Sequence, residues 1–168
     1  MSAETDFERF FLAHYDQLVR SVAAITGDSE VATDSVQEAF IKAYARWSRL
    51  QRYEKPELWV RRVAINKSRD TFRASFRRRR REDRYEASPP PGRLETDEVD
   101  SGLDLVEALG TLTRQQRIVA SLFYIEDISV RDIADTLELS EGAVKFHLNK
   151  ARARLQQVLV PGEGVTNG

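Results

Sequence analysis

Residues 129–155, SVRDIADTLELSEGAVKFHLNKARARL, decide the fold of the second half of the chain. Ser129, followed three residues later by Asp132, is typical of a helix start, and Ser140 can cap a second helix. Residues 138–140 between the two leave room only for a tight turn. Two short helices joined in this way predict a helix-turn-helix, whose second helix can enter the major groove of DNA.

The second helix of this motif separates a buried stripe from an outward face. The stripe consists of Val144, Leu148, Ala151, Leu155 and Val158. The outward residues are Glu141, Lys145, Phe146, Asn149 and Lys150. At base edges, lysine can address guanine, asparagine adenine and a carboxylate the cytosine amine. Phe146 can touch a thymine methyl group or pack on a partner. Arg152 and Arg154, further along, can hold phosphates, although opposing the negative end of the helix is their simplest role.

Helical periodicity also runs through the first half of the chain. One helix is predicted to open with a capping box made by Thr5 and Glu8 and to end at Gly27. A second helix is predicted from about Ser29 to Leu50. A third is expected to begin near Pro56, because proline is favoured in the first turn of a helix. The core face of the second helix is formed by Ala32, Val36, Ala39, Phe40, Ala43, Trp47 and Leu50.

Residues 82–101 interrupt this periodicity. Residues 88–92, SPPPG, cannot continue a helix, because proline lacks the backbone donor and clashes with the preceding turn. After this stretch, Thr113 and Gln116 predict another capping box. The expected fold is therefore all-α, with two small helical domains at 1–81 and 102–160, a flexible acidic linker at 82–101 and a disordered tail at 161–168.

Composition narrows the functional classes. The chain of 168 residues has no cysteine, and its two histidines, His14 and His147, stand far apart, so we expect no metal and no cofactor. Neither a long apolar run nor a signal peptide is recognisable, which predicts a cytoplasmic protein without membrane insertion. No phosphate-binding glycine loop and no nucleophile with a base is found, so the chain is not expected to be an enzyme and catalytic residues are not assigned.

Charge is segregated although the net charge is only −1. Arg73 and the block 77–81 are basic, and most of the charged residues that follow are acidic. The third helix carries further cations, with Phe72 and Phe76 between them, which suits a phosphate backbone and unpaired bases. Two plainer readings stay open, a solubilising helix end for the arginines and core positions for the phenylalanines. The additional cations are Arg61, Arg62, Lys67 and Arg69.

The outward face of the second helix mixes polar and charged side chains with apolar ones. Steps of three, four and seven residues return to the same side of a helix, and they collect Asp34, Gln37, Glu38, Ile41 and Ala45 there. Such a patch either is merely solvated or docks on a basic partner.

Several of these stretches resemble the sigma-70 family, and within it the extracytoplasmic-function group. Residues 34–44, DSVQEAFIKAY, resemble the polymerase-binding helix of that family. Residues 59–66, WVRRVAIN, continued to Asp70 and Arg73, look like the segment that reads the −10 promoter element. Residues 112–117, LTRQQR, and the helix-turn-helix are similar to the group's −35 reader. The resemblance spans nearly the whole chain apart from the linker and the tail.

The resemblance implies a sigma factor that binds core RNA polymerase and directs promoter recognition, −10 melting and initiation at a dedicated set of promoters. Asp34, Gln37, Glu38 and Ile41 would dock on the clamp helices of the largest polymerase subunit. The duplex −35 element would meet Glu141, Lys145, Phe146, Asn149, Lys150 and Arg152. The melted −10 strand would meet Arg52, Tyr53, Arg62, Asn66, Lys67 and Arg73.

Further expectations follow from the same group. The loop 50–55 would hold a flipped −10 base, with Tyr53 as the stacking residue unless this tyrosine packs on the domain edge. The linker would thread toward the RNA exit and active-centre channels, or serve as a plain tether. Trp59 lacks the neighbouring aromatic residue that housekeeping factors use to open DNA, so melting would depend on a good promoter match. A separate anti-sigma protein would supply the off-state.

A different class of protein also fits part of the pattern. A conventional helix-turn-helix regulator would use its first domain to dimerise or to sense a signal, and would bind a duplex operator as a dimer. A sigma factor is expected to form no stable homo-oligomer and to bind core polymerase. Core binding and oligomeric state therefore distinguish the two.

Overall fold

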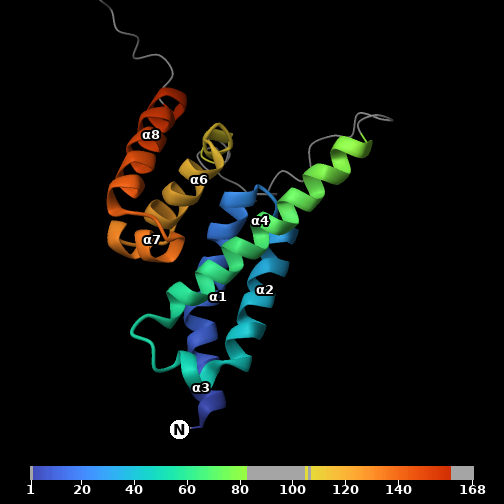
Figure 1. The fold of residues 1–168 in the computed structure, drawn as a ribbon, viewed down its shortest axis with the longest axis vertical. Coiled ribbons are helices and arrows are strands. Elements are labelled where there is room, and N and C mark those ends of the chain that lie inside the picture. Colours follow the sequence, from blue (N-terminus) through green and yellow to red (C-terminus); the bar gives the residue numbers. More distant parts are fainter. Residues whose placement is uncertain (1, 83–104, 106, 160–168) are drawn as a thin grey trace, which may run out of the picture. The chain divides into compact units, whose positions relative to one another are not determined.

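The structure, a computed structural model, describes residues 2–82, 105 and 107–159, with side chains described outside 72–82. The chain divides into two compact units, Met1–Leu94 (unit 1) and Glu95–Gly168 (unit 2). Every regular element in the described ranges is a helix (Figure 1), which confirms the all-α fold. The predicted linker and tail lie outside the described residues, apart from Glu82 at the end of a helix, and the domain bounds remain predictions.

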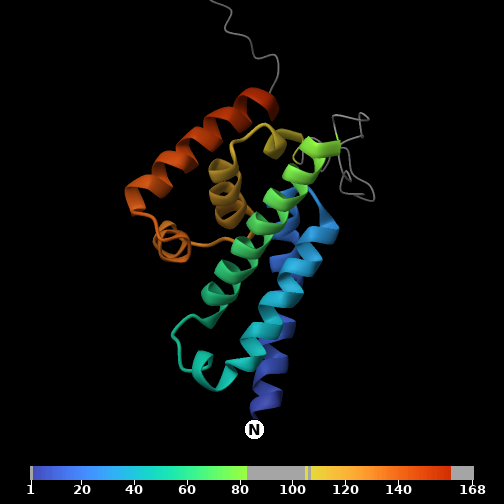
Figure 2. The ribbon, with the colours of Figure 1, turned by 45° about the vertical axis from the view of Figure 1, so that its right-hand side comes forward.

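Unit 1 is built from three long helices and one short one. They are α1 (Ala3–Thr26), α2 (Ser29–Ala45), α3 (Trp47–Leu50) and α4 (Pro56–Glu82). The long helices pack side by side, α2 running opposite to α1 and α4 (Figures 1 and 2). The short connections at Gly27 and before Pro56 were both predicted. Gly27 ends α1 with φ 70°, a conformation that glycine adopts without strain, and its N–H donates to the Ala23 oxygen at 2.8 Å.

The core of unit 1 is rich in aromatic residues. Phe10 and Trp47 lie 5.0 Å apart between ring centroids, and Phe11 meets the buried Phe40 edge-on at 5.0 Å. His14 is half-buried, with its ring 4.9 Å from that of Phe10 between centroids. All seven residues assigned to the core face of the second helix are buried.

Two local predictions in unit 1 are wrong. The first helix starts at Ala3, because Ser2 rather than Thr5 is the N-cap and its hydroxyl accepts from the Thr5 N–H at 3.3 Å. The predicted helix 29–50 is broken at Arg46, whose φ of −115° separates α2 from α3. The break leaves Trp47 and Leu50 buried, so periodicity alone did not reveal it.

Unit 2 contains the predicted helix-turn-helix. Residues 107–110 are helical, and α6 (Arg114–Ala120) runs directly into the π-helical turn η1 (Ser121–Ile125), followed by α7 (Val130–Leu137) and α8 (Glu141–Leu159). Thr113 and Gln116 form the predicted capping box. Ser129 caps α7, accepting from the Asp132 N–H at 3.1 Å, and Ser140 caps α8, accepting from the Ala143 N–H at 3.0 Å.

The turn between α7 and α8 depends on one residue with positive φ. Glu138 adopts φ 56°, and the next residue, Leu139, donates its N–H to the Ala134 oxygen at 3.0 Å. This geometry closes α7 and redirects the chain within three residues.

Along the helices that the structure describes, none is both long and apolar enough to cross a membrane.

Candidate nucleic-acid and partner interfaces

The outward face of α8 presents polar and basic side chains around one aromatic ring. Val144, Leu148 and Ala151 are buried, and Leu155 and Val158 are partly buried. The five residues predicted to face outward in the first turns, Glu141, Lys145, Phe146, Asn149 and Lys150, are all exposed. The helix thus offers charge, amide and apolar groups together, the set that base edges in the major groove require.

Phe146 is the unusual member of this face. Its side chain is 57% exposed, and the Lys150 ammonium lies 5.7 Å from the ring centroid. The half-buried His147 meets the same ring edge-on at 5.5 Å. The ring is therefore positioned by its neighbours on α8 but is not part of the core.

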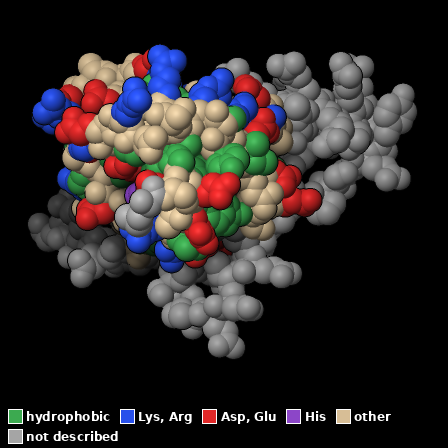
Figure 3. All heavy atoms as spheres, turned by 90° about the horizontal axis from the view of Figure 1, so that it is seen from below, with side chains coloured by type: hydrophobic (Ala, Val, Ile, Leu, Met, Phe, Trp, Pro, Cys, Tyr) green, Lys and Arg blue, Asp and Glu red, His purple; other side chains and the backbone are tan. Residues whose placement is uncertain are grey.

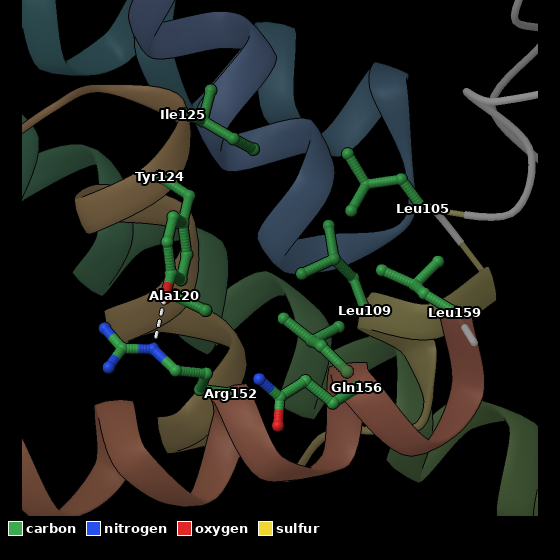
Figure 4. A pocket seen from close by; sticks show the side chains of 9 residues that line it. Leu105, Leu109, Ala120, Tyr124, Ile125, Arg152, Gln156 and Leu159 are labelled. Carbon is green, nitrogen blue, oxygen red and sulfur yellow. Dashed lines mark hydrogen bonds between the residues drawn. The ribbon is translucent and has the colours of Figure 1, made fainter. Parts of the chain in front are cut away.

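Arg152 has a partner 28 positions away in the sequence, which no local pattern predicts. Its Nε donates a hydrogen bond to the Tyr124 hydroxyl at 2.9 Å, which joins α8 to η1 (Figure 4). Both residues line an apolar groove of about 370 Å³ in unit 2. The other lining residues are Leu105, Leu109, Ala120, Ile125, Leu155, Gln156 and Leu159. Segments that are distant in the sequence form this groove, so no local sequence pattern predicts it.

The predicted docking face of α2 is accessible. Asp34, Gln37 and Ile41 are exposed and Glu38 is partly exposed, with Ile41 at 69%. Gln37 and Ile41 also line a groove of about 350 Å³ between α1 and α2. Its remaining walls are aromatic, from Phe7, Phe11, Phe40 and Tyr44. Figure 3, the view from below Figure 1, shows hydrophobic side chains beside acidic ones.

Glu38 connects two of the predicted interfaces. Its carboxylate lies 3.1 Å from the Lys67 ammonium on α4 and 3.4 Å from that of Lys42 on α2. The hydrogen bond from Lys67 is the main reason that the pKa of Glu38 falls below its ordinary value. Residues predicted to contact polymerase and DNA are therefore paired with each other in the isolated chain.

The loop before α4 borders a groove of about 450 Å³. Tyr53, predicted to stack on a base, lines it and is 43% exposed. Trp59 forms another wall, and the Arg46 guanidinium lies 5.9 Å from the centre of its ring. The remaining walls come from Lys42, Arg49, Leu50 and Val63. Cations and aromatic rings around one opening can hold a base and its phosphate. Arg46 and Arg49 reach this groove where the helix breaks at Arg46, a break that helical periodicity does not reveal.

The predicted −10 residues on α4 differ in accessibility. Arg62 and Asn66 are exposed and Lys67 is partly exposed. Arg61, which the sequence grouped with the other cations, is buried at 4% exposure and belongs to the interior of unit 1. The side chain of Arg73, the residues 77–81 and both Phe72 and Phe76 lie outside the described side chains. Arg52 in the loop is exposed.

Family models match both units. The model described as Sigma-70 region 2 matches residues 10–82, and the model described as Sigma-70, region 4 matches residues 102–155. The first match covers α2, the loop and α4, and the second covers α6 to most of α8.

Curated relatives match along most of their length. The chain is 31% identical over 160 residues to the RNA polymerase sigma-E factor of Streptomyces coelicolor, which covers 95% of this chain and 89% of the relative. It is 31% identical over 150 residues to the ECF RNA polymerase sigma factor SigL of Mycobacterium tuberculosis, covering 87% and 84% of the two chains.

Two solved structures share the fold. The sigma factor RpoE of Bartonella quintana, solved with the anti-sigma factor NepR, matches with a TM-score of 0.76 at 23% identity, covering 92% of this chain and 96% of that one. CnrH, solved with the cytosolic domain of CnrY, matches with a TM-score of 0.67 at 23% identity, covering 93% and 88%.

Proposed function

The chain belongs to the sigma-70 family, in its extracytoplasmic-function group, and from that premise we propose how its surfaces divide the work of promoter recognition. As a sigma factor it binds core RNA polymerase and directs transcription initiation at a dedicated set of promoters. Such a subunit is a specificity factor rather than an enzyme, and it acts where polymerase and chromosome meet, in the bacterial cytoplasm.

Unit 1 docks on polymerase through the exposed face of α2. Asp34 and Glu38 supply negative charge and Ile41 supplies an apolar side chain, which suits a partner helix that is basic and partly apolar. The clamp helices of the largest polymerase subunit are the expected partner. Because Glu38 is paired with Lys67 in the free chain, polymerase must compete with this ion pair for the Glu38 carboxylate. Breaking the ion pair offsets part of the free energy of polymerase binding.

Unit 1 also receives the melted −10 strand. The groove beside the loop offers Tyr53 and Trp59 for stacking, with cations at its rim. Arg62, Asn66, Lys67 and Arg73 on α4 and Arg52 in the loop complete the proposed −10 surface. Unstacking one base costs a few kcal/mol, which stacking of about 1–3 kcal/mol per base can offset.

Unit 2 reads the −35 duplex with the early turns of α8. Glu141, Lys145, Phe146, Asn149 and Lys150 project away from the core and meet base edges. Arg152 holds a phosphate while its Nε keeps the bond to Tyr124. The domain bounds 1–81, 82–101, 102–160 and 161–168 stay part of this proposal.

An anti-sigma protein is the proposed off-switch. RpoE of Bartonella quintana and CnrH share the fold; RpoE was solved with the anti-sigma factor NepR, and CnrH with the cytosolic domain of CnrY. Both units of this chain carry an apolar groove, and an amphipathic partner segment would bury such surfaces and exclude polymerase.

The observation that carries this proposal is the order of the two matched regions along one chain, each with its expected polar face exposed. Gel filtration of the purified chain with and without core polymerase tests it. We expect a monomer that joins the core enzyme, and we expect Glu38→Lys to abolish that association, because it replaces the carboxylate by a third ammonium beside Lys42 and Lys67. A stable dimer that binds duplex operators and ignores polymerase would favour the regulator instead.

A further inference from the structure

We infer that Phe146 reads the 5-methyl group of a thymine in the −35 element, so that the promoters of this factor hold a thymine opposite the second turn of α8. The inference rests on the proposed function of unit 2 and deepens it by naming a base. The ring is 57% exposed on the helix face that carries Lys145, Asn149 and Lys150.

The ring does not stabilise unit 2 by burial. The neighbouring residues Val144 and Leu148 fill the core, each at or below 5% exposure, while Phe146 points away from them. Within the described residues, its ring lies 5.7 Å from the Lys150 ammonium and 5.5 Å from the His147 ring, both on the same helix. The ring shares its face with Lys145, Asn149 and Lys150, whose polar groups suit base edges and phosphates, so DNA bound to this face would also meet the ring.

Base chemistry selects the partner of such a ring. In the major groove, guanine, adenine and cytosine present donors and acceptors, and thymine alone adds an apolar group, its C5-methyl. A phenyl ring pressed against guanine O6 and N7 would remove water from both acceptors without replacing their hydrogen bonds. Against a thymine methyl, the same ring removes apolar surface from water on both sides.

Lys150 strengthens the argument for DNA over a protein partner. Its ammonium lies 5.7 Å from the ring centroid, so any surface that contacts the ring also lies close to a positive charge. With Lys145 and Asn149 exposed beside it, the surroundings suit a polyanion. The lysine can then bond a phosphate or a purine N7 next to the thymine, which fixes the ring over the methyl group.

The test removes one methyl group at a time. Promoters are first selected from a random −35 library with holoenzyme assembled from this chain and core polymerase. Each thymine in the selected element is then replaced by deoxyuridine, which lacks only the methyl group, and open-complex affinity is measured with the wild-type chain and with Phe146→Ser. The exposed position makes loss of folding unexpected, and Phe146→Leu, which keeps an apolar contact, serves as the matched control.

One deoxyuridine substitution is expected to weaken the wild-type holoenzyme about fourfold, the factor for burial of one methyl group. The same substitution should leave Phe146→Ser unaffected and should still weaken Phe146→Leu. Selected elements without thymine, or deoxyuridine effects that are equal in wild type and Phe146→Ser, would overturn the inference. A loss with Phe146→Ser that is the same for every −35 sequence would also overturn it and assign the ring to a protein contact. If the wild-type chain fails to direct polymerase at all, the proposed function fails, and this inference with it.

Discussion

Truncation of Ile41 to alanine should weaken binding to core polymerase without weakening the fold. Ile41 is 69% exposed on α2 in the isolated chain. Full burial of an isoleucine side chain contributes about 1.5–3 kcal/mol, so covering roughly two thirds of it contributes about 1–2 kcal/mol. Because about 1.4 kcal/mol corresponds to a tenfold change in affinity, Ile41→Ala is expected to raise the Kd for core polymerase about 5- to 30-fold.

Leu12 provides a matched control for this prediction. It is 70% exposed on α1, outside the predicted docking face and outside the groove between α1 and α2. Fluorescence anisotropy with a labelled chain should show normal core binding by Leu12→Ala, and thermal unfolding should show that neither variant loses stability, since alanine favours helix. Equal core affinity of wild type and Ile41→Ala, or equal losses in the two variants, would refute the assignment of the docking face to α2.

Other predictions address stability and base choice. Burial, together with the charge of Arg61, lowers the pKa of His14 below its ordinary value of 6.5, although Glu57 opposes the shift. The unfolded chain therefore binds this proton more readily, and stability is lost as the pH falls below 6.5. His14→Leu should flatten the fall in Tm between roughly pH 7 and pH 5, and parallel Tm profiles would count against this role. Glu138→Gly should stabilise unit 2 by about 0.5–1 kcal/mol in urea unfolding, because glycine removes the strain of positive φ, whereas Asp135→Gly within α7 should destabilise it. A loss of stability in Glu138→Gly would contradict the strain argument. Lys145→Ala should change −35 base preference, with about 1–3 kcal/mol lost at one base pair, while Arg154→Ala should weaken all sequences alike. Sequencing of promoters selected with each variant checks this prediction. An unchanged base preference in Lys145→Ala, or a changed one in Arg154→Ala, would contradict it.

Local signals in the sequence predicted the boundaries that depend on neighbouring residues. Gly27 ends α1, Pro56 begins α4, and Thr113, Ser129 and Ser140 start helices, because each acts on the backbone within one turn. The buried stripes of α2 and α8 were predicted for a similar reason, since helical spacing determines which residues share a face.

Features that depend on distant segments were not predictable in this way. The break at Arg46 preserves the buried stripe on both sides, so the pattern read as one helix. In the sequence, Arg61 looks like another outward-facing cation of the third helix. In the structure, helix packing buries it. The pairing of Glu38 with Lys67 and the bond from Arg152 to Tyr124 join residues 29 and 28 positions apart. Such contacts depend on how helices pack, which no single stretch encodes.

Run-off transcription with purified core polymerase shows whether this chain directs initiation. Templates carrying a random promoter library are transcribed with core enzyme alone and with core enzyme plus this chain, and the transcripts are sequenced. Transcripts that start at a fixed distance from shared −10 and −35 elements are expected only when the chain is present. The same transcripts in both reactions, or none in either, would show that the chain is not a sigma factor.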